Sequence, residues 1–170
     1  MSNFFFIERK SNKINSPLIV LIHGYGSNER DLFSLIDYFP IDSYVISLRA
    51  PKELFNDSYA WYDIYLDSNN KFYDHDAAAR VRDELFHFID DLSKSPNIDS
   101  NNITLIGFSQ GAILSHAISF SYPEKIKNII ALSGVVDEKI MKKTSLIPKT
   151  NIYISHGTCL LYTSDAADDV

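Results

Sequence analysis

Short, continuous apolar runs alternate with helix-like patterns along this chain, and this alternation restricts the folds open to it. The run at residues 17–22 has no polar interruption, which is typical of a strand buried on both faces. Further apolar runs predict strands at 44–48, 103–106, 127–132 and 151–155, and helical spacing predicts helices at 32–39, 78–92 and 110–120. Strands that alternate with helices build a mostly parallel, doubly wound sheet, so we expect one α/β domain.

Two segments are less regular. Residues 54–73 are rich in aromatic side chains and show no clear period, so we expect an irregular connection there. The helix at 78–92 has Asp74 or Asp76 as its candidate cap, and Pro96 follows its end. Asn28 with Asp31 is a candidate cap for the first predicted helix.

The sequence Gly-Phe-Ser-Gln-Gly at 107–111 matches the pattern G-x-S-x-G. In this pattern the serine lies on a sharp turn between a strand and a helix, and the crowded backbone requires small neighbours. The N-terminus of the next helix then points its N–H groups at developing negative charge. We therefore predict that Ser109 is a nucleophile, and the alternative is a glycine-rich turn with an exposed serine.

A serine nucleophile needs two backbone N–H groups to hold the oxyanion, one of them from the residue after the serine. Gln110 supplies this donor, and Tyr25, in the segment 23–26 (His-Gly-Tyr-Gly) after an earlier strand, is our candidate for the second. A phosphate-binding reading of this loop fails because its third glycine would fall at Glu29. His23 is either a general base or, as we favour, a structural residue of the loop.

Composition excludes several partner classes. The formal net charge is −6 with no basic cluster, which argues against nucleic acids and anionic membranes as partners. The apolar run near the start is too short for a signal peptide or a membrane span, so we expect a soluble, cytoplasmic protein. Cys159 is the only cysteine, so no disulfide framework is expected. His75 is read as part of a solvated helix start and not as a metal ligand.

Five ordered motifs resemble those of the phospholipase/carboxylesterase family, which includes acyl-protein thioesterases. They are His-Gly-Tyr-Gly-Ser-Asn at 23–28, Arg-Ala-Pro at 49–51, Ala-Trp-Tyr-Asp at 60–63, the serine motif at 107–111 and Ser-His-Gly-Thr at 155–158. The resemblance implies an α/β-hydrolase fold and cofactor-free hydrolysis of carboxylic ester or thioester bonds. It also implies that Trp61 and Tyr62 lie near the acyl pocket; the alternative is that this aromatic segment simply packs on the core.

The chain departs from this family after Thr158. The family places the triad acid three residues after the last glycine, where this chain has Leu160, and no histidine follows His156. Residues 159–168 are similar to the translation of a transposase adapter used in sequencing libraries. We therefore expect residues 1–158 to be a partial α/β-hydrolase domain that lacks its C-terminal part, and residues 159–170 to be a foreign tail.

Two function classes remain. The first is a serine hydrolase acting on a small ester or acyl substrate, inactive as printed because the triad aspartate and histidine are missing. The second is a non-catalytic binding protein on the same fold. A nucleotide-binding domain would need a phosphate loop that the sequence does not contain. The sequence specifies neither acyl-chain length, nor ester or thioester preference, nor oligomeric state.

Overall fold

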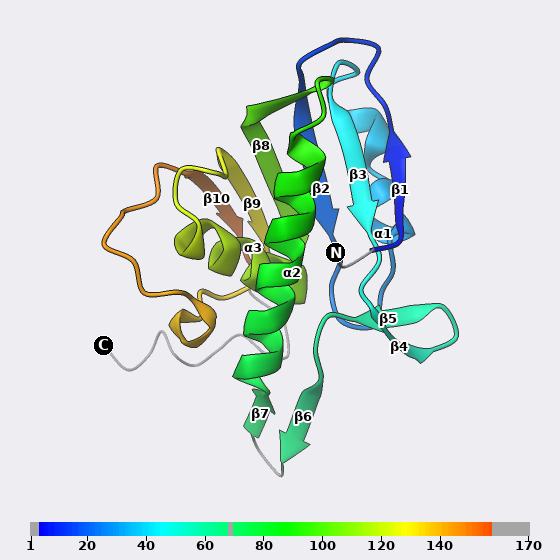
Figure 1. Ribbon diagram of the computed structural model, residues 1–170. Coiled ribbons are helices and arrows are strands. Elements are labelled where there is room, and N and C mark those ends of the chain that lie inside the picture. The colour runs from blue at the N-terminus through cyan, green and yellow to red at the C-terminus, as the bar shows by residue number, and fades with distance from the viewer. Residues whose placement is uncertain (1–3, 68–69, 158–170) are drawn as a thin grey trace.

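The computed structural model describes residues 4–67 and 70–157, which are built around a six-stranded sheet (Figure 1). The strand order is β1-β3-β2-β8-β9-β10, and only β1 runs antiparallel to its neighbour. The strands are β1 Phe6–Arg9, β2 Ser16–Ile22, β3 Tyr44–Leu48, β8 Ile98–Phe108, β9 Asn128–Leu132 and β10 Asn151–Ser155. The mostly parallel sheet predicted from the sequence is confirmed.

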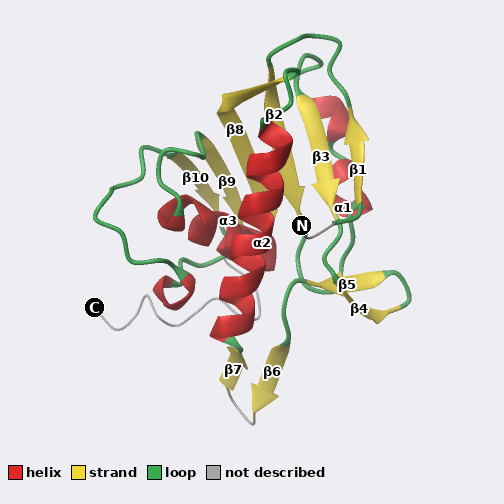
Figure 2. Ribbon diagram, in the orientation of Figure 1, coloured by secondary structure: helices red, strands yellow, loops and turns green. Residues whose placement is uncertain are grey.

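Helices cover both faces of this sheet (Figure 2). The long helices α2 (His75–Ser93) and α3 (Gln110–Ser121) pack on one face, and the short α1 (Arg30–Phe33) packs on the other. Alternate residues of β2 point to opposite faces of the sheet. Val20 belongs to the hydrophobic cluster that contains Leu85 of α2, and Leu21 belongs to the cluster that contains Leu32 of α1. The unbroken apolar run of β2 is therefore explained by burial on both faces. In the described part of the chain, no helix is long and apolar enough to cross a membrane.

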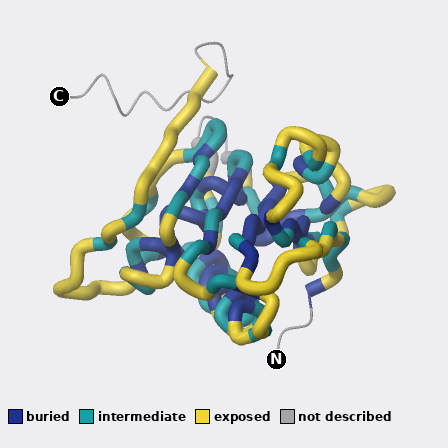
Figure 3. Tube along the Cα trace, turned by 90° about the horizontal axis from the view of Figure 1, so that it is seen from above, coloured by how far each residue is buried: buried dark blue, intermediate teal, exposed yellow. Residues whose placement is uncertain are grey.

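Burial falls off toward one edge of the sheet. The buried residues gather along its middle (Figure 3), where β2 and β3 are almost wholly buried. By contrast, all five residues of β10 are exposed. The strand β10 pairs in parallel with β9, from Asn151 beside Asn128 to Ser155 beside Leu132.

The first predicted helix is shorter than its apolar spacing suggested. The structure has α1 over four residues and then a separate 3-10 turn, η1, at Ile36–Tyr38. Glu29 occupies the N-cap position of α1 but makes no capping hydrogen bond, because its carboxylate binds Arg49. The Ser34 hydroxyl donates to the Asp31 carbonyl (2.6 Å) at the end of α1. Side-chain bonds to the backbone of this kind compete with helix continuation.

The segment expected to be irregular forms two hairpins. Strand β4 (Lys52–Phe55) pairs with β5 (Ser58–Ala60), and β6 (Ile64–Asp67) pairs with β7 (Asn70–Tyr73). Asn56 and Asp57 turn the first hairpin with φ angles of 36° and 63°, which asparagine and aspartate tolerate better than most residues. Strand β1 and a 3-10 turn, η2 (Glu138–Ile140), were also not predicted, whereas the cap of α2 was: the Asp74 carboxylate accepts from the Asp76 and Ala77 N–H groups.

The substitution Leu105→Ala tests the core. Leu105 is fully buried in the middle of β8, so we expect the cavity to lower the free energy of unfolding by about 2–5 kcal/mol. The control is Ile41→Ala at a position 74% exposed, which we expect to change it by less than about 0.5 kcal/mol. Urea denaturation followed by circular dichroism measures both, and equal losses would contradict the assignment of Leu105 to the core.

Candidate active site

Ser109 lies on a strained turn between the end of β8 and the start of α3. Its φ and ψ angles are 51° and −111°, outside the regions that residues other than glycine favour. The Ser109 N–H donates to the Leu132 carbonyl (2.9 Å), and its carbonyl accepts from the Ala112 and Ile113 N–H groups (3.0 and 3.1 Å). The predicted sharp strand-to-helix turn is therefore present, and backbone bonds from two elements hold it in place.

Two glycines make this turn possible. A Cβ on Gly111 would lie 1.9 Å from the Ile22 carbonyl oxygen, and one on Gly107 would lie 2.3 Å from the carbonyl carbon of Gly111. Real Cβ atoms do not approach backbone atoms so closely, so neither position has space for a side chain. The first turn of α3 thereby packs directly on the end of β2, where the segment that contains Tyr25 begins.

The loop that contains Tyr25 lies against the Ser109 turn. A Cβ on Gly24 would be 2.8 Å from the Phe108 ring and 3.3 Å from the Phe108 carbonyl oxygen. Gly26 has a φ of 79°, a conformation that favours glycine. The two loops therefore lie side by side at the carboxyl ends of β2 and β8. The assignment of the Tyr25 and Gln110 N–H groups as oxyanion donors stays a prediction.

The Gln110 side chain connects the turn to the aromatic segment. It is 1% exposed; its Oε1 accepts from the Trp61 N–H (3.1 Å) and its Nε2 donates to the Tyr62 carbonyl (2.8 Å). The Trp61 indole N–H donates to the His23 carbonyl (2.8 Å). Trp61 and Tyr62 are themselves only 2% and 3% exposed, so both pack in the core. Their contact with an acyl chain stays a prediction.

His23 has a structural role, as we favoured. Its Nδ1 donates to the Gly24 carbonyl (2.7 Å), and its Nε2 accepts from the Ala50 N–H (3.1 Å). Burial lowers the pKa of the imidazole, so the ring is neutral near pH 7, in agreement with one donating and one accepting nitrogen. Both nitrogens are occupied in the loop and neither bonds to Ser109.

The other described histidines are not placed to act as a general base for Ser109 either. Over residues 4–67 and 70–157, no histidine makes a hydrogen bond to the Ser109 hydroxyl, and His156 after β10 is exposed. His75 lies 3.6 Å from the Asp137 carboxylate at the start of α2. In this same part of the chain, no group of three or more histidine, cysteine or acidic side chains could hold a metal ion. The predicted adapter-like tail at residues 159–170 lies outside the described residues, and its sequence contains no histidine.

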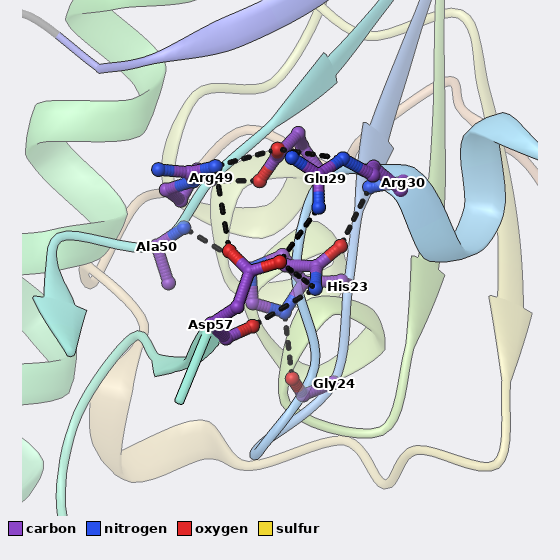
Figure 4. Close-up of polar contacts among 8 residues, drawn as sticks. His23, Gly24, Glu29, Arg30, Arg49, Ala50 and Asp57 are labelled. Atoms are coloured by element: carbon purple, nitrogen blue, oxygen red, sulfur yellow. Dashed lines mark hydrogen bonds and ion pairs between the residues drawn. The ribbon is translucent and has the colours of Figure 1, made fainter. Parts of the chain in front are cut away.

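An ion pair that no sequence motif predicts lies beside the end of the Tyr25 loop. Glu29 directly follows this loop and Arg49 directly follows β3, and their side chains meet (Figure 4). Arg49 belongs to the motif Arg-Ala-Pro, but its partner is twenty residues away and no local pattern marks it. A charged residue directly after a buried strand is the one signal that points to this pair.

The strain at Ser109 can be measured by comparing Ser109→Gly with Ser109→Ala. Both remove the hydroxyl, but only glycine adopts a positive φ without steric cost, so we expect Ser109→Gly to be more stable by about 1 kcal/mol. The matched pair at Ser119, inside α3, should show the reverse order by about 1 kcal/mol. Thermal and urea unfolding compare the four variants; the same order at both positions would argue against strain.

Two buried histidines should make stability depend on pH. Burial lowers the pKa of His23 and of His116, whose two ring nitrogens have no hydrogen-bond partner among residues 4–67 and 70–157. Just below pH 6.5, the two histidines therefore bind protons in the unfolded chain but stay neutral in the folded chain. The resulting stability is present above the ordinary histidine pKa of 6.5 and is lost as the pH falls below it toward the folded value.

Urea titrations at about pH 7, 6 and 5 test this dependence, in which each group contributes a slope of up to about 1.4 kcal/mol per pH unit. We expect His116→Leu to reduce the slope and to leave or raise the stability at pH 7, because it removes buried polar atoms without partners. An unchanged slope in this variant would show that His116 is protonated equally in both states.

Comparison with known proteins agrees with this geometry. A model of the phospholipase/carboxylesterase family matches residues 2–163. The chain is 28% identical over 113 residues to MhqD of Bacillus subtilis (strain 168), and 35% identical over 75 residues to acyl-protein thioesterase 1 of Schizosaccharomyces pombe (strain 972 / ATCC 24843). These matches cover 66% and 44% of this chain, and the chain spans only 54% and 33% of those relatives.

Solved structures show the same fold. A carboxylesterase from Bacillus cereus superposes with a TM-score of 0.79 at 24% identity, over 97% of this chain and 76% of that one. Acyl-protein thioesterase 2 of Zea mays superposes with a TM-score of 0.61 at 19% identity, over 78% of this chain and 62% of that one. Given the family match over nearly the whole sequence and the shared α/β-hydrolase fold, the chain belongs to the phospholipase/carboxylesterase family.

Proposed function

We propose that this chain carries the nucleophile and the oxyanion hole of a serine hydrolase for carboxylic ester or thioester bonds. The observation that carries the proposal is the strained turn at Ser109, held beside the Tyr25 loop by the contact of Gly111 with Ile22. Backbone strain of this kind persists only where the surrounding structure imposes it, and it is concentrated at functional sites. Ser109 directly follows β8, at the carboxyl end of the parallel strands, where α/β folds bind ligands.

In the proposed reaction, the Ser109 Oγ attacks the carbonyl carbon and its proton passes to a histidine that an aspartate orients. The Tyr25 and Gln110 N–H groups hold the oxyanion of the tetrahedral intermediate. The intermediate expels the alcohol or thiol, which takes the proton back from the histidine. Water, deprotonated by the same histidine, then attacks the acyl carbon; the acid is released and Oγ regains a proton. We propose that Trp61 and Tyr62 support the acyl pocket from behind, since Gln110 binds both through its side chain.

The histidine and the aspartate are proposed to lie in native sequence that follows Thr158. We expect that sequence to place an aspartate at position 160 and a histidine some tens of residues later. The proposed substrates are small esters or acyl compounds. Residues 1–158 carry a formal net charge of −3, since three of the acidic residues lie in the tail, and this charge disfavours nucleic acid as a partner. We propose the cytoplasm as the compartment.

The second candidate is a binding protein without catalysis. It is favoured by the described residues themselves, in which no histidine bonds to the Ser109 hydroxyl. A serine without a base is a weak nucleophile at neutral pH. Enzymes of this kind that lose a triad member keep only about 10³–10⁴-fold acceleration over water.

Reading the gene past the Thr158 codon and assaying both versions of the protein tests the proposal. We expect the version with the native continuation to hydrolyse p-nitrophenyl butyrate, and Ser109→Ala to lower its kcat by about 10³-fold or more. A fluorophosphonate should label this version at Ser109, as shown by mass spectrometry of the peptide. The chain as printed is the matched control and should show only residual hydrolysis. If the native continuation contains no acid or histidine, and Ser109→Ala changes nothing, the binding-protein function replaces the hydrolase.

A further inference from the structure

The Glu29 carboxylate is buried and fully paired. It is 1% exposed, and its two oxygens accept from Nε (2.6 Å) and Nη2 (2.7 Å) of Arg49, as Figure 4 shows. The hydrogen bond from Arg49 is the main reason that the pKa of Glu29 lies below its ordinary value, so the carboxylate is charged near pH 7. A two-pronged pair between arginine and carboxylate fixes the relative orientation of the two side chains as well as their distance.

Arg49 is itself held from several sides. Its guanidinium carbon lies 4.3 Å from the centre of the Phe5 ring and 4.6 Å from the centre of the Tyr59 ring. Its Nη2 also lies 3.7 Å from the Asp57 carboxylate in the turn between β4 and β5. Arg49 therefore joins the residue after the Tyr25 loop to the end of β3 and to the first hairpin.

The backbone of the Tyr25 loop is tied to the same hairpin. The Gly26 N–H donates to the Tyr59 carbonyl (2.9 Å), and the Tyr59 N–H donates to the Ser27 carbonyl (2.8 Å). On the other side of Tyr25, His23 accepts from the Ala50 N–H, next to Arg49. The peptide that carries the Tyr25 N–H thus lies between two anchored points, both of which rest on residues that contact or adjoin Arg49.

We propose that Glu29 and Arg49 form a positioning pair, which fixes the loop from His23 to Asn28 so that the Tyr25 N–H is aimed at the oxyanion before substrate binds. This inference rests on the proposed hydrolase function. An oxyanion hole accelerates a reaction because its donors need no reorganisation as charge develops, so its loop must be held rigidly. The pair touches no reacting atom and acts through the loop.

The stability of the fold alone gives no strong reason for this pair. A buried ion pair often contributes little more than apolar residues of the same volume, because both charges lose their hydration. A bidentate pair of hydrogen bonds between arginine and carboxylate fixes the relative orientation of the two side chains, whereas an apolar contact does not. The prediction is therefore a loss of loop order and of catalytic rate, which separates a positioning role from a merely structural one.

Hydrogen–deuterium exchange of the chain as printed provides the first test. We expect Arg49→Lys, which keeps the charge but loses the fork, and Glu29→Gln to speed exchange in the peptide covering residues 24–28 by about tenfold or more. Exchange in α3 should be unchanged. The control is Arg9→Lys: Arg9 donates to the Ile36 and Pro40 carbonyls (2.8 and 2.7 Å) but lies beside Val45, at the opposite end of β3.

Ester hydrolysis by the version with the native continuation is the second test. We expect Arg49→Lys and Glu29→Gln to lower kcat by about ten- to a hundredfold, less than the full loss of an oxyanion donor, with KM within about twofold. The double variant should lower kcat by no more than the more impaired of the two single variants, because the two residues act as one unit. Arg9→Lys should keep the unsubstituted kcat and KM.

Each outcome decides one question. Unchanged exchange and unchanged kcat in both variants, or a change confined to KM, would overturn the positioning role. Global unfolding of both variants, seen by circular dichroism, would overturn it too, since the pair would then support the whole fold. If the unsubstituted protein shows no Ser109-dependent hydrolysis, the proposed function fails, while the exchange data still report whether the pair anchors the loop.

Discussion

The approach of the Gly111 backbone to the Ile22 carbonyl is the contact on which the rest of this site depends. It seats the first turn of α3 on the end of β2, which forces the chain through the strained conformation at Ser109. The same contact brings the Tyr25 loop beside that serine. A single methyl group on Gly111 would displace α3, and with it the Gln110 side chain that holds the backbone of Trp61 and Tyr62.

Much of this arrangement follows from local sequence signals. The run at β2 and the glycines around Ser109 predict a doubly buried strand and a sharp turn, because burial on two faces and backbone crowding act over a few residues. The hairpins at 52–60 and 64–73 were missed because their aromatic residues show no clear alternation. The turn of the first hairpin depends on positive φ angles at Asn56 and Asp57, which the sequence permits but does not require.

Long-range pairing accounts for the other differences. The apolar spacing predicts a helix over residues 32–39, but Glu29 pairs with Arg49 instead of capping α1, and the Ser34 hydroxyl binds the Asp31 carbonyl where α1 ends. The sequence leaves open whether Trp61 lies near the acyl pocket or packs on the core, and its hydrogen bond to the His23 carbonyl shows that it packs against the loop. Such contacts join residues tens of positions apart in the sequence, and the hydrophobic periodicity of a segment cannot predict them.

The order of strands in the sheet also affects how the chain is made. Strand β2 leaves the ribosome early, yet one of its two neighbours, β8, is translated only after both hairpins and the whole of α2. Until then the apolar run of β2 has a free edge on the side where β8 belongs, and such edges are prone to mispairing. Because β8 is synthesised long after β2, and because distant parallel strands pair slowly, this edge of β2 stays unpaired for a long interval. Chaperones can bind β2 during that interval.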